Sequence, residues 1–374
     1  MKSVALAFAG LCLCAVAAWL ALYATDPSVQ ASAAFENGDT ATAVDLFRRA
    51  LRGDNANAYY WADLGEALPE SGQSKQARYC MDRALELAPY VPAIWVRHAN
   101  FCFLRNDYAA ALRSAARVLQ TVPDYDEVLF NYFDRIVEDP ERVLAAIGGQ
   151  SRTTRAWLAH QIAVKNATAA NLAWRRIASA GYADAPLAAQ YVEFLLDRQS
   201  WDLAQSTWAR FLGDRRSDYP AQNLLYNGNF NSEPLPGPLD WHFRSEPGVF
   251  ETARGHQGVR ITFHGKDNVD YYGLFQTAVI SRPGRYRLSM HIKTEGITTN
   301  EGVRLAVADM GLVSEPITGT NGRTTVDLEF TTTRPRSVRV AVVRRPSEKF
   351  DNKIEGSAWV ESVKLAPVVS SSQY

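Results

Sequence analysis

Cysteine is scarce in this chain of 374 residues, which contains only four. Two of them lie in an apolar amino-terminal run, so Cys80 and Cys102 alone remain for the rest of the sequence. Two cysteines are too few for the disulfide framework that holds small secreted domains together. We predict that both are buried thiols, and a Cys80–Cys102 bridge in an oxidising compartment is the alternative.

The sequence also lacks an excess of charge of either sign. Forty Lys and Arg residues are balanced by 40 Asp and Glu residues. Proteins that bind nucleic acid usually show a basic excess or a basic stripe, so no nucleic-acid partner is expected. The Arg-rich stretch from Arg334 to Arg345 is the local exception. We interpret it as a solvated strand face, with contact to an anion or an acidic glycan as the alternative.

Catalytic motifs are absent as well. The chain contains no G-x-S-x-G elbow, H-E-x-x-H, C-x-x-C, P-loop or G-x-G-x-x-G pattern, and its six His residues are scattered. His98 falls at a packing position of a helix, where a hydrogen-bonded structural role is expected. We therefore predict a protein that is not an enzyme.

One long apolar run opens the chain. Val4 to Tyr23 contains 20 apolar and small residues without a charge. At about 1.5 Å per residue, a helix of this length spans the roughly 30 Å hydrocarbon core of a bilayer. Lys2 precedes the run, which favours a cytoplasmic start, and Trp19 lies near its outer end. We predict an anchor at residues 1–25 that crosses the bacterial inner membrane once and leaves the bulk of the chain in the periplasm. A cleaved signal peptide is the alternative.

A 34-residue spacing organises the next part of the chain. One copy has its packing residues at Ala58, Trp61, Leu64, Gly65, Leu68, Ala77, Met81, Ala84 and Pro89. These offsets resemble those of tetratricopeptide repeats. The resemblance implies a stack of helix pairs whose concave surface binds a protein partner.

Further copies keep the same spacing. They begin at Ala24 and Pro92, and after a shorter, irregular stretch from Asp126 to Gln150 two more helix pairs begin near Ser151 and Ala185. The predicted repeat region is 26–219.

Beyond Tyr219 the helical period gives way to short alternating runs between turn residues. The predicted strands are Gly258–Phe263, Leu274–Ile280, Tyr286–Ile292, Val303–Ala308, Thr324–Phe330, Ser337–Val343 and Ala358–Leu365. Such runs are typical of an antiparallel β-sandwich, here of about eight strands. The expected domain is 222–367, followed by a flexible tail at 368–374.

Several segments of this domain resemble the jelly-roll, galactose-binding-like carbohydrate-binding modules attached to bacterial polysaccharide-degrading enzymes. They are Leu224–Phe230, Pro238–Trp241, Gly284–Ser289, Ile292–Thr294 and Lys349–Leu365. The resemblance implies a jelly roll that contacts a glycan. Trp241 and Trp359 fall within the matching framework, so we expect both in the core.

Sugar sites on such folds need flat aromatic rings together with amides or carboxylates. The densest group of this kind is Tyr271, Tyr272, Phe275 and Gln276, which we predict as the glycan-binding residues. Strand alternation places Tyr272 and Gln276 on the side of Leu274, and Tyr271 and Phe275 on the other. One of the two sets must face the core, and the alternative is that these aromatics mainly pack the sandwich.

The resemblance also implies a structural calcium ion between the first and last strands. The two family positions are occupied by Asn231 and Glu361, an amide and a longer carboxylate that could supply oxygen ligands. A metal-free sandwich is the alternative, and no other cofactor is expected.

Together these features predict a membrane-anchored periplasmic scaffold that is accessory to polysaccharide assembly or export. In one alternative the sandwich is purely structural. In another it is a glycan-acting enzyme, which would need two carboxylates about 5 to 9.5 Å apart.

Overall fold

The computed structural model describes residues 26–255 and 258–368. The chain divides between Ile177 and Ala178 into two compact units. The predicted anchor at residues 1–25 lies outside the described residues. Within the described part, no helix combines the length and the apolar character needed to cross a membrane.

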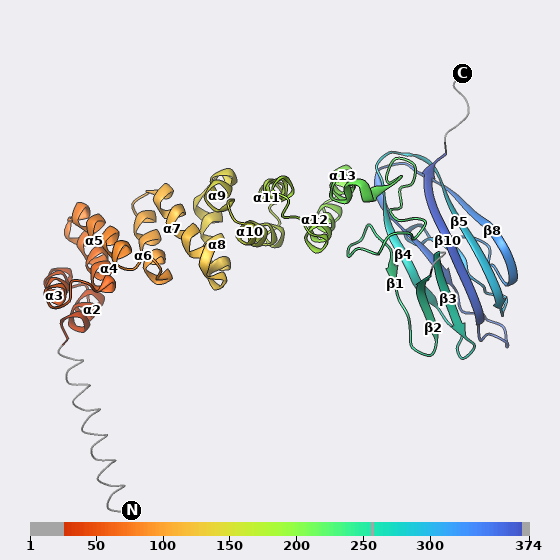
Figure 1. Ribbon diagram of the computed structural model, residues 1–374, viewed down its shortest axis with the longest axis horizontal. Coiled ribbons are helices and arrows are strands. Elements are labelled where there is room, and N and C mark those ends of the chain that lie inside the picture. Colours follow the sequence, from red (N-terminus) through yellow and green to blue (C-terminus); the bar gives the residue numbers. More distant parts are fainter. Residues whose placement is uncertain (1–25, 256–257, 369–374) are drawn as a thin grey trace, which may run out of the picture. The chain divides into compact units, whose positions relative to one another are not determined.

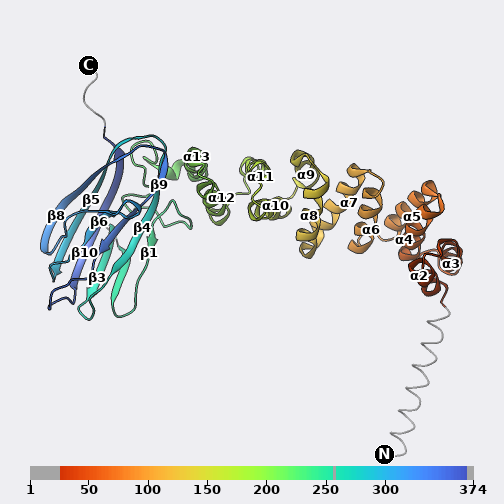
Figure 2. The same cartoon turned by 180° about the vertical axis from the view of Figure 1, so that it is seen from behind.

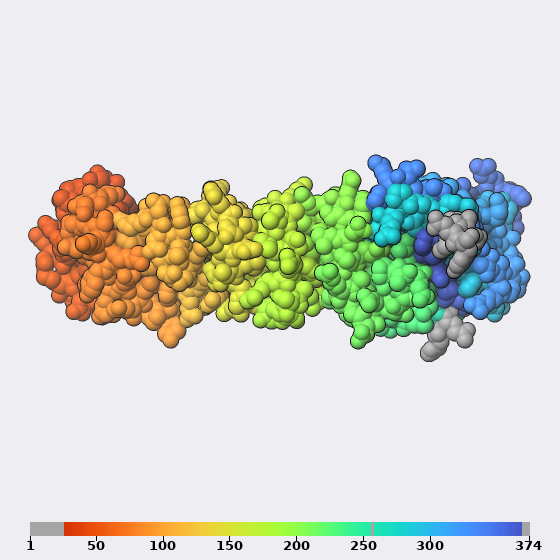
Figure 3. Space-filling view, turned by 90° about the horizontal axis from the view of Figure 1, so that it is seen from above, coloured from red at the N-terminus to blue at the C-terminus, as the bar shows by residue number. Residues whose placement is uncertain are grey.

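The first unit consists of successive helix pairs (Figure 1). They are α2 (Pro27–Glu36) with α3 (Thr40–Gly53), α4 (Ala58–Ala67) with α5 (Ser74–Leu87), α6 (Pro92–Phe103) with α7 (Tyr108–Thr121), α8 (Asp126–Ile136) with α9 (Pro140–Ile147), and α10 (Ser151–Ala163) with α11 (Ala167–Ser179). Each helix buries one stripe; in α3 this stripe is Ala43, Val44, Phe47, Ala50 and Leu51. Figure 3 shows that side chains fill the space between neighbouring pairs of this unit.

The 34-residue period is visible in individual contacts. The indole nitrogen of Trp61 donates to the carbonyl of Asn55 at 2.9 Å, and that of Trp95 donates to the carbonyl of Pro89, also at 2.9 Å. Both the donors and the acceptors are 34 positions apart. The predicted spacing is therefore confirmed. Cys80 and Cys102 are buried free thiols, and burial raises the pKa of each to about 11.

The turn inside most pairs, though not α8–α9, places one residue in the left-handed region. Gly38 and Gly72 adopt φ of 79° and 75°, and Asn106 follows at the same repeat position with φ of 59°. In α12 (Ala185–Asp197) with α13 (Trp201–Leu212), a pair of the second unit, Gln199 occupies this turn with φ of 59°. A side chain with a Cβ atom is strained in this conformation, by about 1–2 kcal/mol.

Gln199→Gly is therefore expected to raise the free energy of unfolding by about 1 kcal/mol, because glycine adopts positive φ without a steric cost. Urea unfolding followed by circular dichroism measures the effect. Gly72→Ala is the matched control and should change stability in the opposite direction. An unchanged midpoint for Gln199→Gly would contradict the strain argument.

The stretch from Asp126 to Gln150, expected to be irregular, forms the pair α8–α9. The carboxylate of Asp139 accepts a hydrogen bond from the amide of Glu141 at 2.9 Å, and Pro140 occupies the first turn of α9. An acidic cap followed by proline is a strong helix start. The 34-residue spacing does not predict this pair because α9 has eight residues, whereas α3, α5 and α7 have 14 each.

The second unit continues from α12 and α13 into a β domain, in which the described residues form ten strands. They are β1 (His242–Phe243), β2 (Phe250–Gly255), β3 (Gly258–His264), β4 (Tyr271–Ile280), β5 (Gly284–Ile297), β6 (Arg304–Val307), β7 (Leu312–Val313), β8 (Gly319–Thr332), β9 (Arg336–Arg344) and β10 (Glu355–Pro367). All seven predicted strands are present. The prediction missed β1, β2 and β7, two of which contain only two residues.

The strands form two antiparallel sheets of five. Sheet A has the order β1-β4-β9-β6-β7 and sheet B the order β2-β3-β10-β5-β8. Figure 2 shows β9 and β6, which continue sheet A beyond β4. One apolar core combines side chains of both sheets, such as Leu274 and Val340 from sheet A and Ile261 and Leu288 from sheet B. Trp241 is buried in this core, as predicted.

The pair α12–α13 packs against the sheets within the second unit. The amide nitrogen of Gln205 donates to the carbonyl of Val279 in β4 at 3.2 Å. The ring of Trp208 meets that of Tyr226 edge-on, with centroids 6.4 Å apart. These contacts link the last helix pair to the β domain.

Candidate functional site

Two of the four predicted glycan-binding residues are fully buried. The hydroxyl of Tyr271 lies 2.9 Å from that of Thr252, and its ring packs edge-on against Phe250 inside the core. Gln276 donates to the carbonyls of Tyr226 and Leu239 at 3.0 and 2.9 Å. A side chain closed off from solvent cannot contact a polysaccharide, so Tyr271 and Gln276 have structural roles here.

The other two, Tyr272 and Phe275, lie together on the outer face of sheet A. Their ring centroids are 5.3 Å apart, and both side chains are partly buried. A shift of the β4–β9 register between Tyr271 and Leu274 brings them to one face. The simple alternation expected from the sequence fails at this bulge, which turns Tyr271 inward with Leu274 and Tyr272 outward.

Phe275 has polar neighbours on this face. The ring of His242 stacks on it at 4.9 Å with an interplanar angle of 10°, and the guanidinium of Arg339 lies 5.9 Å from its centroid. Tyr272 and Phe275 stay candidates for a glycan contact.

Trp359, expected in the core, lies on the outer face of sheet B. Its neighbours Ala358 and Val360 are fully buried, whereas Trp359 is partly exposed. Arg260 of β3 and Lys293 of β5 each place their charge 5.4 Å from its ring centroid. The structure thus places at the surface a partly exposed aromatic ring that the framework match predicts in the interior.

A polar hollow of about 560 Å³ opens on the same face of sheet B. Its lining includes Arg287, Ser289, His291, Asp327, Ser362 and Lys364. The hydroxyl of Ser362 lies 3.1 Å from Nδ1 of His291, and that of Ser289 donates to Asp327 at 2.5 Å. Hydroxyls, an imidazole and charges of both signs are groups that bind sugar hydroxyls.

The two predicted calcium ligands have other contacts or remain exposed. Glu361 forms an ion pair with Arg323 at 2.8 Å, and Asn231 is exposed, with its amide donating to the side chain of Asn229. Among residues 26–255 and 258–368, no group of three or more His, Cys, Asp or Glu residues could hold a metal ion. Calcium stays a prediction.

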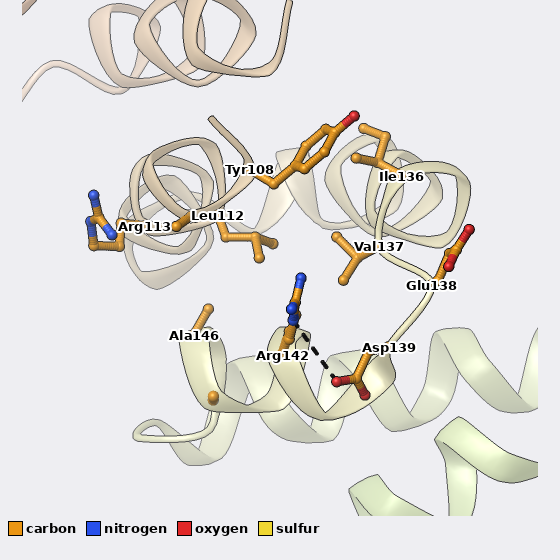
Figure 4. Close-up of a pocket in the computed structure, with 11 residues that line it drawn as sticks. Tyr108, Leu112, Arg113, Ile136, Val137, Glu138, Asp139, Arg142 and Ala146 are labelled. Carbon is orange, nitrogen blue, oxygen red and sulfur yellow. Dashed lines mark ion pairs between the residues drawn. The ribbon is translucent and has the colours of Figure 1, made fainter. Parts of the chain in front are cut away.

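The first unit contains a groove of about 890 Å³ between α7 and α9 (Figure 4). Tyr108 and Leu112 line one side, Val137 and Glu138 line the other, and Arg142 on α9 forms an ion pair with Asp139 at 4.0 Å. The groove accompanies the short α9, which is roughly 9 Å shorter than α7 at about 1.5 Å per residue. Its apolar floor and charged rim could hold a segment of a protein partner.

His98 connects three helices of the first unit. Its Nδ1 lies 2.8 Å from the hydroxyl of Ser114 on α7, and its Nε2 lies 3.2 Å from Asp82 on α5. The residue types are those of a Ser-His-Asp triad, but Ser114 is only 2% exposed. A substrate has no access to that hydroxyl, so the cluster acts in packing, as expected for His98.

Stability of the first unit should depend on the charge of His98. Burial lowers the pKa of His98, although hydrogen bonding to Asp82 opposes the shift. As the pH falls, His98 is therefore protonated in the unfolded chain before it is protonated in the folded chain. The free energy of unfolding is full above about pH 6.5 and decreases as the pH falls from there towards the lower pKa of the folded state. Urea midpoints at pH 7.5 and 5.5 measure the loss. His98→Gln should reduce the difference between the urea midpoints at the two pH values. An unchanged difference would contradict the attribution of this pH dependence to His98.

Comparison with known proteins supports the repeat assignment. Residues 34–97 match the family model of the tetratricopeptide repeat. A comparison with curated protein sequences found no match.

Three solved structures are among those that this chain matches. The pilF protein of Pseudomonas aeruginosa is 16% identical, with 50% of this chain and 89% of that chain covered and a TM-score of 0.28. The MamA protein is 14% identical, with 48% and 95% covered and a TM-score of 0.27. A carbohydrate-binding module of Cellvibrio mixtus lichenase 5A, solved with cellotriose, is 12% identical, with 34% and 92% covered and a TM-score of 0.22. This chain thus matches the tetratricopeptide repeat over residues 34–97, and its helical pairs are followed by a two-sheet β domain.

Proposed function

We propose that this chain is a non-enzymatic scaffold of the bacterial envelope, in which the helical repeats bind a protein partner and the β domain contacts a glycan. Helical repeats present extended surfaces that serve mainly for binding. The groove between α7 and α9 provides such a surface with both apolar and charged walls.

The proposed glycan contact is supported by the polar hollow of about 560 Å³ on sheet B, close to the partly exposed Trp359. An aromatic ring beside convergent polar groups is the usual chemistry of a sugar site. Tyr272 and Phe275 on sheet A offer a second, more apolar surface.

The location follows from the apolar run Val4–Tyr23, which would hold the repeats and the β domain on the periplasmic side of the inner membrane. A protein contact and a glycan contact held near the bilayer suit an accessory of polysaccharide assembly or export. This step rests on the combination of domains, which is an analogy at the level of fold.

Titration of the full chain against a panel of acidic and neutral polysaccharides tests the glycan contact. Binding of any member supports the proposal. Absence of binding to every member would favour the second candidate, a β domain that is purely structural. The burial of Tyr271 and Gln276 supports this candidate.

For the anchor, a variant that lacks residues 1–25 should move from the membrane fraction to the soluble fraction.

A further inference from the structure

We propose that the outer face of sheet B binds an acidic polysaccharide, with Trp359 as its aromatic contact and Arg260 and Lys293 as the groups that pair with its carboxylates. The inference rests on the proposed glycan function and specifies both the face and the chemical class of the ligand.

The three side chains form one row across the middle of sheet B. Trp359 of β10 is the direct cross-strand partner of Arg260 in β3 and of Lys293 in β5. Both cations lie 5.4 Å from the Trp359 ring centroid, a distance at which a cation is attracted to an aromatic ring. The row therefore presents two positive charges beside one flat apolar ring.

These two charges are not neutralised within the described part of the chain. Neither Arg260 nor Lys293 has a carboxylate within ion-pair distance among residues 26–255 and 258–368, and besides its contact with the Trp359 ring Arg260 donates to the hydroxyl of Ser357 at 3.3 Å. Other cations of the same face are paired: Arg287 with Glu329 at 2.6 Å and Arg323 with Glu361 at 2.8 Å. Two cations without a carboxylate partner beside a partly exposed ring favour an anionic ligand, since charge-assisted hydrogen bonds to carboxylates are the stronger ones.

The row is continuous with the polar hollow. His291 precedes Lys293 by two positions on β5, so both side chains point to the same face about 7 Å apart. His291 and its neighbour Ser362 line the hollow, and Lys364 adds another exposed cation to its wall. A chain of sugars could thus extend from the ring of Trp359 into a site lined with hydroxyls.

The outer face of sheet A is less suited to an anion. Its aromatic pair packs with Ala341 and Val343 into a small apolar cluster, and Arg339 is the cation that lies over Phe275. Phe275→Ala therefore tests the competing face, because Phe275 is an outward-facing aromatic residue on the opposite sheet.

The test compares two polymers of matched length on the purified full chain. One is polygalacturonate, a polyuronate, and the other is the same polymer with its carboxylates reduced to alcohols. Calorimetric titration should show at least tenfold tighter binding of the polyuronate, weakening as salt screens the charges. Trp359→Ala and Lys293→Gln should each weaken it at least tenfold, while Tyr90→Ala, at an exposed aromatic residue of the first unit, changes it less than twofold. Lys75→Gln, at an exposed lysine of the first unit, controls for net charge and should have a smaller effect than Lys293→Gln.

The outcomes separate the inference from the proposed function. Equal binding of both polymers, equal effects of Lys293→Gln and Lys75→Gln, or a loss confined to Phe275→Ala would overturn the inference, while the glycan function would stand. Absence of binding to these polymers and to the wider polysaccharide panel would overturn both. Trp359 lies outside the core, so its variants should keep the wild-type thermal unfolding midpoint, and Trp359→Phe should retain part of the affinity.

Discussion

Arg344→Ala is expected to lower the free energy of unfolding of the second unit by about 3–5 kcal/mol, the cost of disrupting a buried, hydrogen-bonded charge. The side chain of Arg344 is fully buried at the end of β9. Its guanidinium donates to the carbonyls of Glu301 and Asn352, both at 3.1 Å, to the carbonyl of Val269, and to the side chain of Asn268 at 2.9 Å.

These acceptors belong to three loops that the guanidinium holds together. Burial lowers the pKa of Arg344, and Glu301 and Asp270 oppose the shift. An arginine nevertheless stays charged at any ordinary pH, so its charge is stabilised mainly by the carbonyl dipoles around it. Alanine would leave several buried carbonyls without a donor and would open a cavity.

The neighbouring Arg345 is the matched control, because it is exposed. Arg345→Ala should change stability by less than about 0.5 kcal/mol. Arg344→Lys should recover little, since a single ammonium group cannot reproduce the planar set of donors. Urea unfolding of the three variants measures these differences, and similar midpoints for Arg344→Ala and Arg345→Ala would refute the role of Arg344.

Trp208→Ala is expected to cost about 3–5 kcal/mol, as for other large aromatic side chains removed from a core. Trp208 is fully buried and packs on Phe211 at 5.5 Å and on Tyr226 at 6.4 Å. Because Tyr226 belongs to the β domain, the variant should loosen that domain together with α13.

Hydrogen exchange of the backbone amides tests whether α12–α13 unfolds together with the sheets or independently of them. If α12–α13 and the sheets form one cooperative unit, exchange should accelerate both in α13 and in β4, which Gln205 contacts. Acceleration confined to α13 would show instead that the pair unfolds independently. Trp201→Ala, a partly exposed residue on the same helix, should have a much smaller effect.

Local patterns predicted most elements of this fold. The 34-residue period located the helix pairs because each repeat uses the same contacts, such as those of Trp61 and Trp95. Alternation located seven strands for a similar reason, since one face of each meets the core. The pair α8–α9 was missed because its short second helix interrupts the period, although Asp139 and Pro140 carry a helix start signal.

The candidate site was predicted less well, and two residues show why. Alternation along β10 places Trp359 on the face opposite to Ala358 and Val360, whereas the resemblance to carbohydrate-binding modules predicts Trp359 in the core. Alternation along β9 likewise turns Arg344 inward with Val340 and Val342. A buried arginine is acceptable only because three loops bring carbonyls to it, and those loops are far apart in the sequence.

By itself, the sequence determined the order of helices and strands, because spacing and alternation are local properties of the chain. The tertiary structure alone decided which polar and aromatic side chains reach the surface. The bulge that separates Tyr271 from Tyr272 depends on pairing with β9, and the free charges of Arg260 and Lys293 depend on which carboxylates the neighbouring strands supply. Such contacts join residues distant in sequence, and no local pattern encodes them.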